Sequence, residues 1–185
     1  MTEQEIIAGC LKKNAICQHL LFSKYSRQLM TVCYRYAGTS SEAEDMLQES
    51  FIKIFSSIPQ YRSEGSFEGW LRKITVNTCL RKLQKIKIVY DDLSGLETLN
   101  DAVHPDIISA LSEKELIALI SNLPQGYRIV FNLSVIEGFS HDEIAAILGI
   151  RAATSRSQLI KARRQLQKQL VEYQKIFLQH ERKRI

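Results

Sequence analysis

The spacing of the apolar residues constrains this chain more than any other feature. Apolar side chains recur every three or four residues in almost every segment, and no segment sustains the two-residue alternation of a strand. In the first long stretch, Leu21, Tyr25, Leu29, Val32 and Tyr36 would stack on one face of a helix. The sequence therefore predicts an all-α fold.

Turn residues and charge divide the helical pattern into two parts. Gly38 and Pro59 end the first two helices, and the loop YRSEGS leads to a third helix from about Phe67 to Ile86. The periodicity then breaks in an acidic stretch that contains Asp91, Asp92, Glu97, Asp101 and Asp106. We expect two small helical domains, residues 1–87 and 108–185, joined by a flexible acidic linker of residues 88–107.

The composition excludes several classes of protein. The four cysteines form no CxxC pair and the four histidines lie far apart, which predicts buried reduced thiols and neither a metal nor a cofactor. No nucleophile–base pair or phosphate loop indicates an enzyme. The N-terminal sequence MTEQEIIAGCLKKN is unlike a signal peptide, and no stretch approaches the roughly 20 apolar residues of a membrane span. We expect a cytoplasmic protein without membrane insertion.

The stretch GFSHDEIAAILGIRAATSRSQLIKARRQL, residues 138–166, is typical of two helices around a glycine turn. Ser140 and Glu143 are spaced as a capping box, so the first helix should begin at His141. Gly149 supplies the turn. The net charge of +5 is compatible with a polyanionic partner, and this end of the chain concentrates the bases.

The second helix of this pair has a polar face without acids, while Leu159, Ala162, Leu166 and Leu170 face inward. A solvated helix usually interleaves glutamate with lysine, whereas a helix that enters a DNA groove avoids acids because phosphates line the groove. We therefore favour DNA binding over a plain basic surface. The predicted DNA-binding residues are Arg151, Thr154, Ser157, Gln158, Lys161, Arg164, Gln165 and Lys168.

Two longer blocks resemble one bacterial family. LPQGYRIVFNLSVIEGFSHDEIAAILGIRAATSRSQLIKARRQL resembles region four of extracytoplasmic-function (ECF) sigma factors, and AEDMLQESFIKIFSSIPQYRSEGSFEGWLRKITVNTCLRKL resembles region two. The resemblance implies a dissociable, non-catalytic subunit that binds the RNA polymerase core, recognises promoter DNA and helps to melt it. It also implies an anti-sigma factor as a further partner. Ser155 and Arg151 depart from the pattern, which usually has an aliphatic residue and a serine cap there.

A stripe of Asp45, Gln48, Glu49 and Ile52 runs along the second helix, apart from the apolar face. Carboxylates repel phosphates, so an acidic stripe with an outward isoleucine suits a protein partner; a solvated face with one stray apolar residue is the alternative. The resemblance implies that this stripe contacts the clamp coiled coil of the polymerase core.

The third helix aligns Trp70, Lys73, Asn77 and Arg81 along one side. An aromatic ring, bases and an amide suit melted single-stranded DNA, although Trp70 alone is equally compatible with a core position. The resemblance implies that an extruded base of the minus-ten element is captured by Tyr61, Arg62, Ser63 and Asn77.

Two other functions fit parts of the sequence. A conventional helix-turn-helix regulator would bind duplex operator DNA without polymerase, but it leaves the stripe from Asp45 to Ile52 unexplained. A helical adaptor that binds proteins alone does not explain the acid-free face of the last helix. The sigma-factor interpretation accounts for both surfaces.

Overall fold

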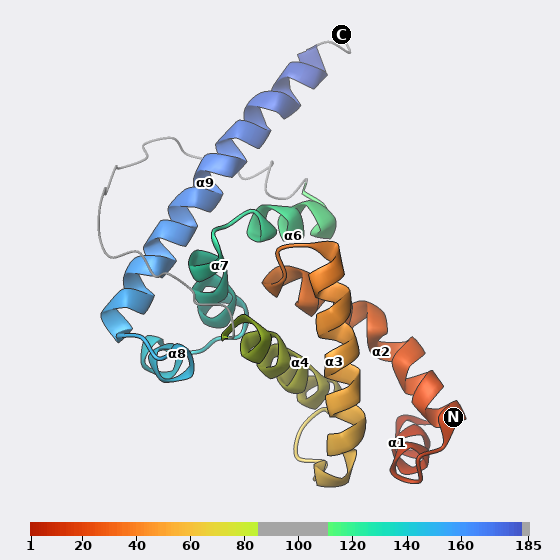
Figure 1. The fold of residues 1–185 in the computed structure, drawn as a ribbon. Helices are drawn as coiled ribbons and strands as arrows, with labels where there is room; N and C mark the ends of the chain where they lie inside the picture. The colour runs from red at the N-terminus through yellow and green to blue at the C-terminus, as the bar shows by residue number, and fades with distance from the viewer. Residues whose placement is uncertain (85–110, 183–185) are drawn as a thin grey trace. The chain divides into compact units, whose positions relative to one another are not determined.

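The computed structural model describes residues 1–84 and 111–182, and all its regular elements are helical (Figure 1). The chain divides into two compact units, Met1–Lys87 and Ile88–Ile185. The predicted all-α fold of two small helical domains is therefore confirmed, while the predicted linker, residues 88–107, lies outside the described residues. In chain order the elements are α1 (Glu3–Leu11), α2 (Ala15–Tyr36), α3 (Ser40–Ser57), the short 3-10 helix η1 (Ile58–Gln60), α4 (Phe67–Gln84), α6 (Glu113–Ser121), α7 (Gln125–Phe131), the π-helical turn η2 (Asn132–Ile136), α8 (His141–Leu148) and α9 (Ala152–Arg182).

The first unit is built on α2, α3 and α4, which pack on one another, while α1 lies against α2 (Figure 1). Burying a large apolar side chain contributes about 1.5–3 kcal/mol relative to leaving it exposed, so these contacts decide which faces turn inward. The remaining faces of α3 and α4 are left for solvent or partners. The large side chains buried at this centre include Leu21, Leu29, Tyr36, Met46, Ile54 and Leu71.

Side-chain caps fix where α3 and α4 begin. The Thr39 hydroxyl accepts a hydrogen bond from the Glu42 N–H at 3.2 Å, and the Glu42 carboxylate accepts one from the Gly38 N–H at 2.7 Å. At α4, the Ser66 hydroxyl accepts a hydrogen bond from the Gly69 N–H at 3.1 Å. These bonds satisfy amides that the first turn of a helix leaves unpaired. They also set the start of each helix and hence which residues face outward.

In the second unit, α7 and α8 pack against the N-terminal half of α9, around Ile129, Leu133, Ile144 and Ala162. A hydrogen bond joins α6 to α9: the Tyr173 hydroxyl donates to the Glu115 carboxylate at 2.5 Å. Together with bonds from Ser112, it lowers the pKa of Glu115 to about 2. Glu115 therefore stays ionised near neutral pH and serves both as a cap for α6 and as its contact with α9.

Disulfides, clusters of metal-binding side chains and membrane-spanning helices are absent from the described residues. Cys10, Cys17, Cys33 and Cys79 are buried and form no disulfide. No group of three or more His, Cys, Asp or Glu side chains within the described ranges is arranged to hold a metal ion. Among the same residues, no helix is long and apolar enough to cross a membrane.

The turn between α8 and α9 has the geometry that the sequence predicted. Ser140 and Glu143 form the capping box of α8, with the Ser140 N–H donating to the Glu143 carboxylate at 2.8 Å. These bonds from Ser140 lower the pKa of Glu143. Gly149 closes α8 with φ 67° and ψ 33°, in the left-handed region that glycine adopts most readily. The two helices are thus joined by a turn that depends on one glycine.

Replacing Gly149 tests this dependence without a packing change, because a Cβ there would meet nothing within 4 Å. We expect Gly149→Ala to destabilise the second unit by about 1–2 kcal/mol, the cost of a left-handed alanine. Hydrogen exchange of the α8 amides should accelerate by about 5- to 30-fold. Gly149→Asn is the matched control and should cost less, since asparagine tolerates this conformation. Equal exchange in the alanine variant and the native chain would contradict the prediction.

Candidate functional site

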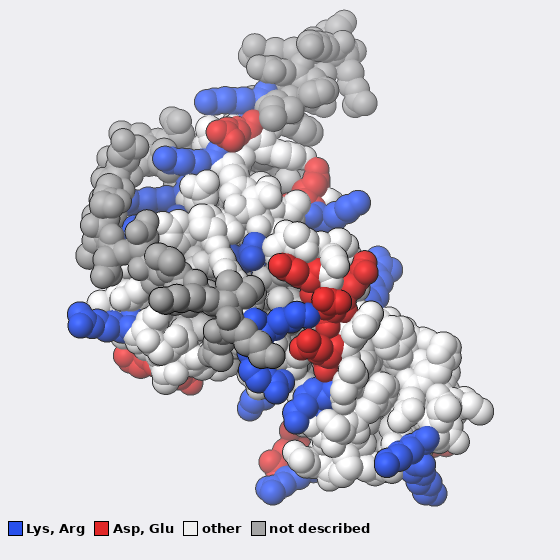
Figure 2. Space-filling model, viewed as in Figure 1, with Lys and Arg blue, Asp and Glu red and all other residues white. Residues whose placement is uncertain are grey.

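The first candidate surface lies on the outward face of α3. Asp45, Gln48, Glu49 and Ile52 are all exposed, and Ile52 is 70% exposed. The opposite side of the same helix carries the buried Leu47, Phe51 and Ile54, which explains why the four residues point outward together. Figure 2 shows carboxylates gathered over α3 in this view. We call these four residues the α3 stripe.

Lys82 of α4 joins the α3 stripe from the side. Its ammonium lies 3.4 Å from the Asp45 carboxylate and 3.5 Å from the Glu49 carboxylate. Like charges one helical turn apart repel each other, and the shared cation offsets this repulsion. The side chains of Asp45 and Glu49 stay 61% and 56% exposed, so both carboxylates remain accessible from outside. This contact of Lys82 cannot be predicted from the sequence, because nothing local relates it to residues more than thirty positions earlier.

The second candidate surface combines the loop before α4 with the exposed side of that helix. Trp70 is half-buried: its ring stacks on the buried Phe67 at a centroid distance of 5.6 Å and lies 5.2 Å from the Tyr61 ring. The ring thus packs on the core and keeps an outward part, and its role toward DNA stays a prediction. The residues predicted around it, Arg62, Ser63, Lys73, Asn77 and Arg81, are all exposed.

The third candidate surface is on α9, along which lysine and arginine side chains project (Figure 2). Seven of the eight predicted residues reach the surface. Arg151 stands just before the helix, and its carbonyl accepts the first helical hydrogen bond from the Ser155 N–H at 3.1 Å. The exposed ones are Arg151, Gln165 and Lys168, and the partly buried ones are Thr154, Ser157, Lys161 and Arg164.

The prediction that Gln158 lies on the outer face is wrong, because its side chain is fully buried. The buried residues of this part of α9 are Ser155, Gln158, Leu159 and Ala162, spaced i, i+3, i+4 and i+7. Helical geometry therefore places Gln158 inside in spite of its polarity. Ser155 is buried as well, and its hydroxyl lies 2.8 Å from Nδ1 of His141 at the start of α8. The serine that departs from the usual aliphatic residue thus makes a polar link between the two helices.

Three exposed residues of α9 were not predicted as part of this surface. Arg156, Ile160 and Arg163 all face solvent, and Ile160 is 45% exposed. Ile160 stands directly after the inward Leu159, whereas Arg156 and Arg163 lie three and four residues from Leu159, at the border of the inward face, so spacing alone did not mark the two arginines as outward. The basic face of α9 is therefore broader than predicted and includes an apolar side chain.

The comparisons with known proteins agree for both units. The family model "Sigma-70 region 2" matches residues 21–87, and "Sigma-70, region 4" matches residues 113–166. The ECF RNA polymerase sigma factor SigE of Mycolicibacterium smegmatis is 33% identical over 161 residues, which cover 83% of this chain and 61% of that relative. The ECF RNA polymerase sigma-E factor of Haemophilus influenzae is 28% identical over 182 residues, which cover 92% of this chain and 96% of that relative.

The chain belongs to the ECF sigma factor family. This family is the class of RNA polymerase subunit that acts in promoter recognition and transcription initiation. Among solved structures, the sigma factor RpoE from Bartonella quintana, in complex with the anti-sigma factor NepR, is similar at 22% identity with a TM-score of 0.49; the match covers 83% of this ECF factor and 96% of that chain.

Proposed function

We propose that this ECF factor binds the RNA polymerase core through the α3 stripe and reads promoter DNA through α4 and α9. One observation carries the proposal: two adjacent helices of the first unit present opposite chemistry. The α3 stripe offers two carboxylates and an exposed isoleucine, whereas α4 and the loop before it offer cations, an amide and the rings of Trp70 and Tyr61. A protein partner on α3 would leave α4 free for nucleic acid, which is the arrangement that an initiation subunit needs.

The α3 stripe suits a basic and partly apolar protein surface. Asp45 and Glu49 would repel a phosphate backbone, and Ile52 adds an apolar contact that DNA phosphates do not use. We assign this stripe to the clamp coiled coil of the core, as the resemblance implies. A conventional regulator has no need of such a surface.

The loop and α4 suit a strand whose bases have left the duplex. Tyr61 and Trp70 offer ring surface for stacking, and Lys73 and Arg81 offer charge to the phosphates. Asn77 offers both a hydrogen-bond donor and an acceptor, which can recognise the edge of an unpaired base. We assign these residues, with Arg62 and Ser63, to the minus-ten element.

The basic face of α9 suits duplex DNA at the minus-thirty-five element. Arg164 and Lys161 are outward bases, and a helix of this kind contacts base edges and phosphates from within the major groove. Gln158 is excluded from direct contact by its burial. Arg151 sits at the helix start, where a cation opposes the helix dipole and a phosphate would relieve the opposition.

We further propose that the chain acts in the cytoplasm and supplies specificity without catalytic chemistry of its own. The family relationship supports both statements, because the polymerase core performs the reaction. An anti-sigma factor that covers one of these surfaces would regulate it. The α9 face would then contribute to the choice of promoter, and the partner would determine the inducing signal.

Replacing Asp45, Gln48 and Glu49 together with alanine tests the polymerase contact. We expect co-purification with core to fall and run-off transcription from a cognate promoter to be lost, because the exposed charges that meet the clamp are removed. The helical circular dichroism should be unchanged, since none of the three is buried. A triple variant that co-purifies and transcribes like the native chain would refute the assignment. DNA binding without core at native strength would favour a conventional regulator.

Replacing Arg164 or Lys161 with alanine tests the α9 face. A lost base contact should weaken binding of a minus-thirty-five duplex by the holoenzyme by about 1–3 kcal/mol. A lost phosphate contact should instead reduce the slope of log affinity against log salt by about one. Lys175→Ala is the control, an exposed base further along the same helix. If both variants bind like this control, the DNA does not lie on this face.

Replacing Asn77 with alanine separates melting from duplex binding. Duplex DNA hides the base edge that an amide would recognise, so we expect core association and minus-thirty-five binding to stay nearly native. Opening of the minus-ten element should be impaired by about 1–3 kcal/mol, seen as lower permanganate reactivity of its thymines. A pre-melted bubble template should recover part of the loss, because strand separation is already done. Native footprints on linear duplex would make Asn77 a structural residue.

A further inference from the structure

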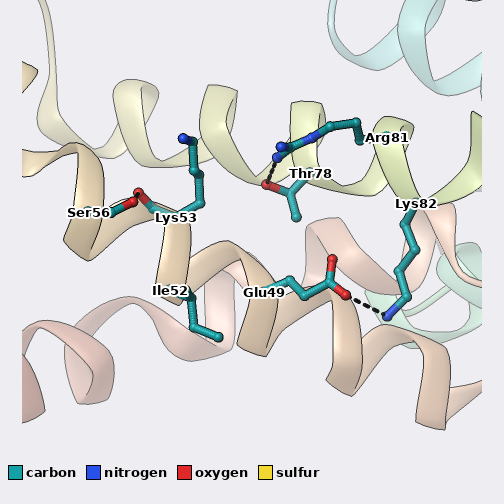
Figure 3. Close-up of a pocket in the computed structure, with 7 residues that line it drawn as sticks. All are labelled: Glu49, Ile52, Lys53, Ser56, Thr78, Arg81 and Lys82. Atoms are coloured by element: carbon teal, nitrogen blue, oxygen red, sulfur yellow. Dashed lines mark hydrogen bonds and ion pairs between the residues drawn. The ribbon is translucent and has the colours of Figure 1, made fainter.

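A cleft of about 240 Å³ lies between α3 and α4, beside the α3 stripe. Glu49, Ile52 and Lys53 line it from α3, and Thr78, Arg81 and Lys82 line it from α4. Figure 3 shows the Lys53 side chain extending from α3 toward α4, and the Arg81 side chain running along α4 to Thr78. The cleft therefore has an acidic side, already paired with Lys82, and a second side that carries two further cations.

Within residues 1–84 and 111–182, the two further cations have no acidic partner. Arg81 donates to the Thr78 hydroxyl at 3.5 Å. Among the residues that the structure describes, no carboxylate forms an ion pair with Lys53 or Arg81. Both side chains are exposed. Two neighbouring cations without a counter-charge form a ready site for an outside anion.

The rest of the lining indicates which kind of anion fits. A nucleic-acid strand presents a phosphate at every step, and the carboxylates of Glu49 and Asp45 beside the cleft would repel it. Ile52, 70% exposed at the same cleft, suits an apolar side chain. A mixture of both charges with an isoleucine between them suits a protein surface on which each charge meets its opposite.

We propose that the cleft receives an acidic side chain of the RNA polymerase core, which pairs with Lys53 on the α3 side of the cleft. This inference rests on the proposed binding of core to the α3 stripe, and it adds the chemistry of the partner. Along α3 the outward order is Asp45, Glu49, Ile52 and Lys53, a span of about 12 Å at the rise of an α-helix. The core surface would thus present a basic, an apolar and an acidic residue in that order over the same length.

This order of charges gives the contact a direction. A partner segment laid the other way along α3 would place its acid against Asp45 and its base against Lys53. Such like-charge contacts oppose binding, so the cleft would select one orientation and register of the bound segment. Lys53 is the residue to test, because Arg81 is also assigned to the minus-ten surface.

The experiment measures equilibrium binding of the labelled full chain to purified core polymerase without DNA. We expect Lys53→Glu to weaken binding at least about tenfold, by removing an attraction and adding a repulsion, and Lys53→Arg to stay within about twofold of native. The loss should shrink as salt is raised, because screening weakens exposed charge pairs. Lys12→Glu, at the exposed end of α1 outside the cleft lining, controls for the change in net charge and should stay within about twofold.

Native affinity of Lys53→Glu for core would overturn the proposal. If affinity for core is native but the holoenzyme binds promoter DNA less well, the cleft holds a phosphate, which overturns it equally. Lys53→Gln removes the charge without adding another and should weaken binding less than Lys53→Glu; circular dichroism confirms that each variant is folded. The triple alanine variant of Asp45, Gln48 and Glu49 separates the two levels. If the triple variant no longer binds core while Lys53→Glu still does, core binding by the α3 stripe is supported and the pairing of Lys53 with an acidic side chain of core is refuted.

Discussion

The packing of α3 against α4 is the contact on which the surfaces of the first unit depend. Each helix buries one face against the other and against α2, and each is capped so that its first turn is fixed. This packing determines which residues of the two helices remain exposed. An acidic face and a basic face can therefore lie side by side on a unit of fewer than ninety residues. Lys82 reaches from one to the other and keeps the neighbouring carboxylates from repelling each other.

In the second unit, α9 shows a competition between polarity and helical spacing. Ser155 and Gln158 lie at inward positions of the helix and are buried with Leu159 and Ala162. A buried polar group must find partners, and Ser155 finds one in His141 of the preceding helix. The orientation of α9 relative to α8 is thus held by the left-handed glycine and by a polar contact. The basic residues in this part of α9 still face outward, although two of its polar residues, Ser155 and Gln158, face inward.

Features that depend on neighbouring residues could be predicted from the sequence, and features that depend on packing between distant segments could not. The capping box of Ser140 and Glu143 and the turn at Gly149 are local, and both occur as predicted. The ion pairs of Lys82 arise because two helices far apart in sequence lie together. The polarity of Gln158 predicts an outward position, but its spacing from Leu159 and Ala162 places it inside. The roles of the site residues toward polymerase and DNA stay predictions, because partners decide them.

Trp70 gives the chain an optical property. It is the single tryptophan of the sequence, and its half-buried indole contacts the rings of Phe67 and Tyr61, which also contact each other. Indole emission responds to the polarity and stacking of its surroundings, so all tryptophan fluorescence of the protein originates at the edge of one surface. Any strand that stacks there changes the signal without a label, while events on α9 leave no tryptophan trace of their own. The fluorescence of Trp70 would thus report binding at the surface proposed to capture a base.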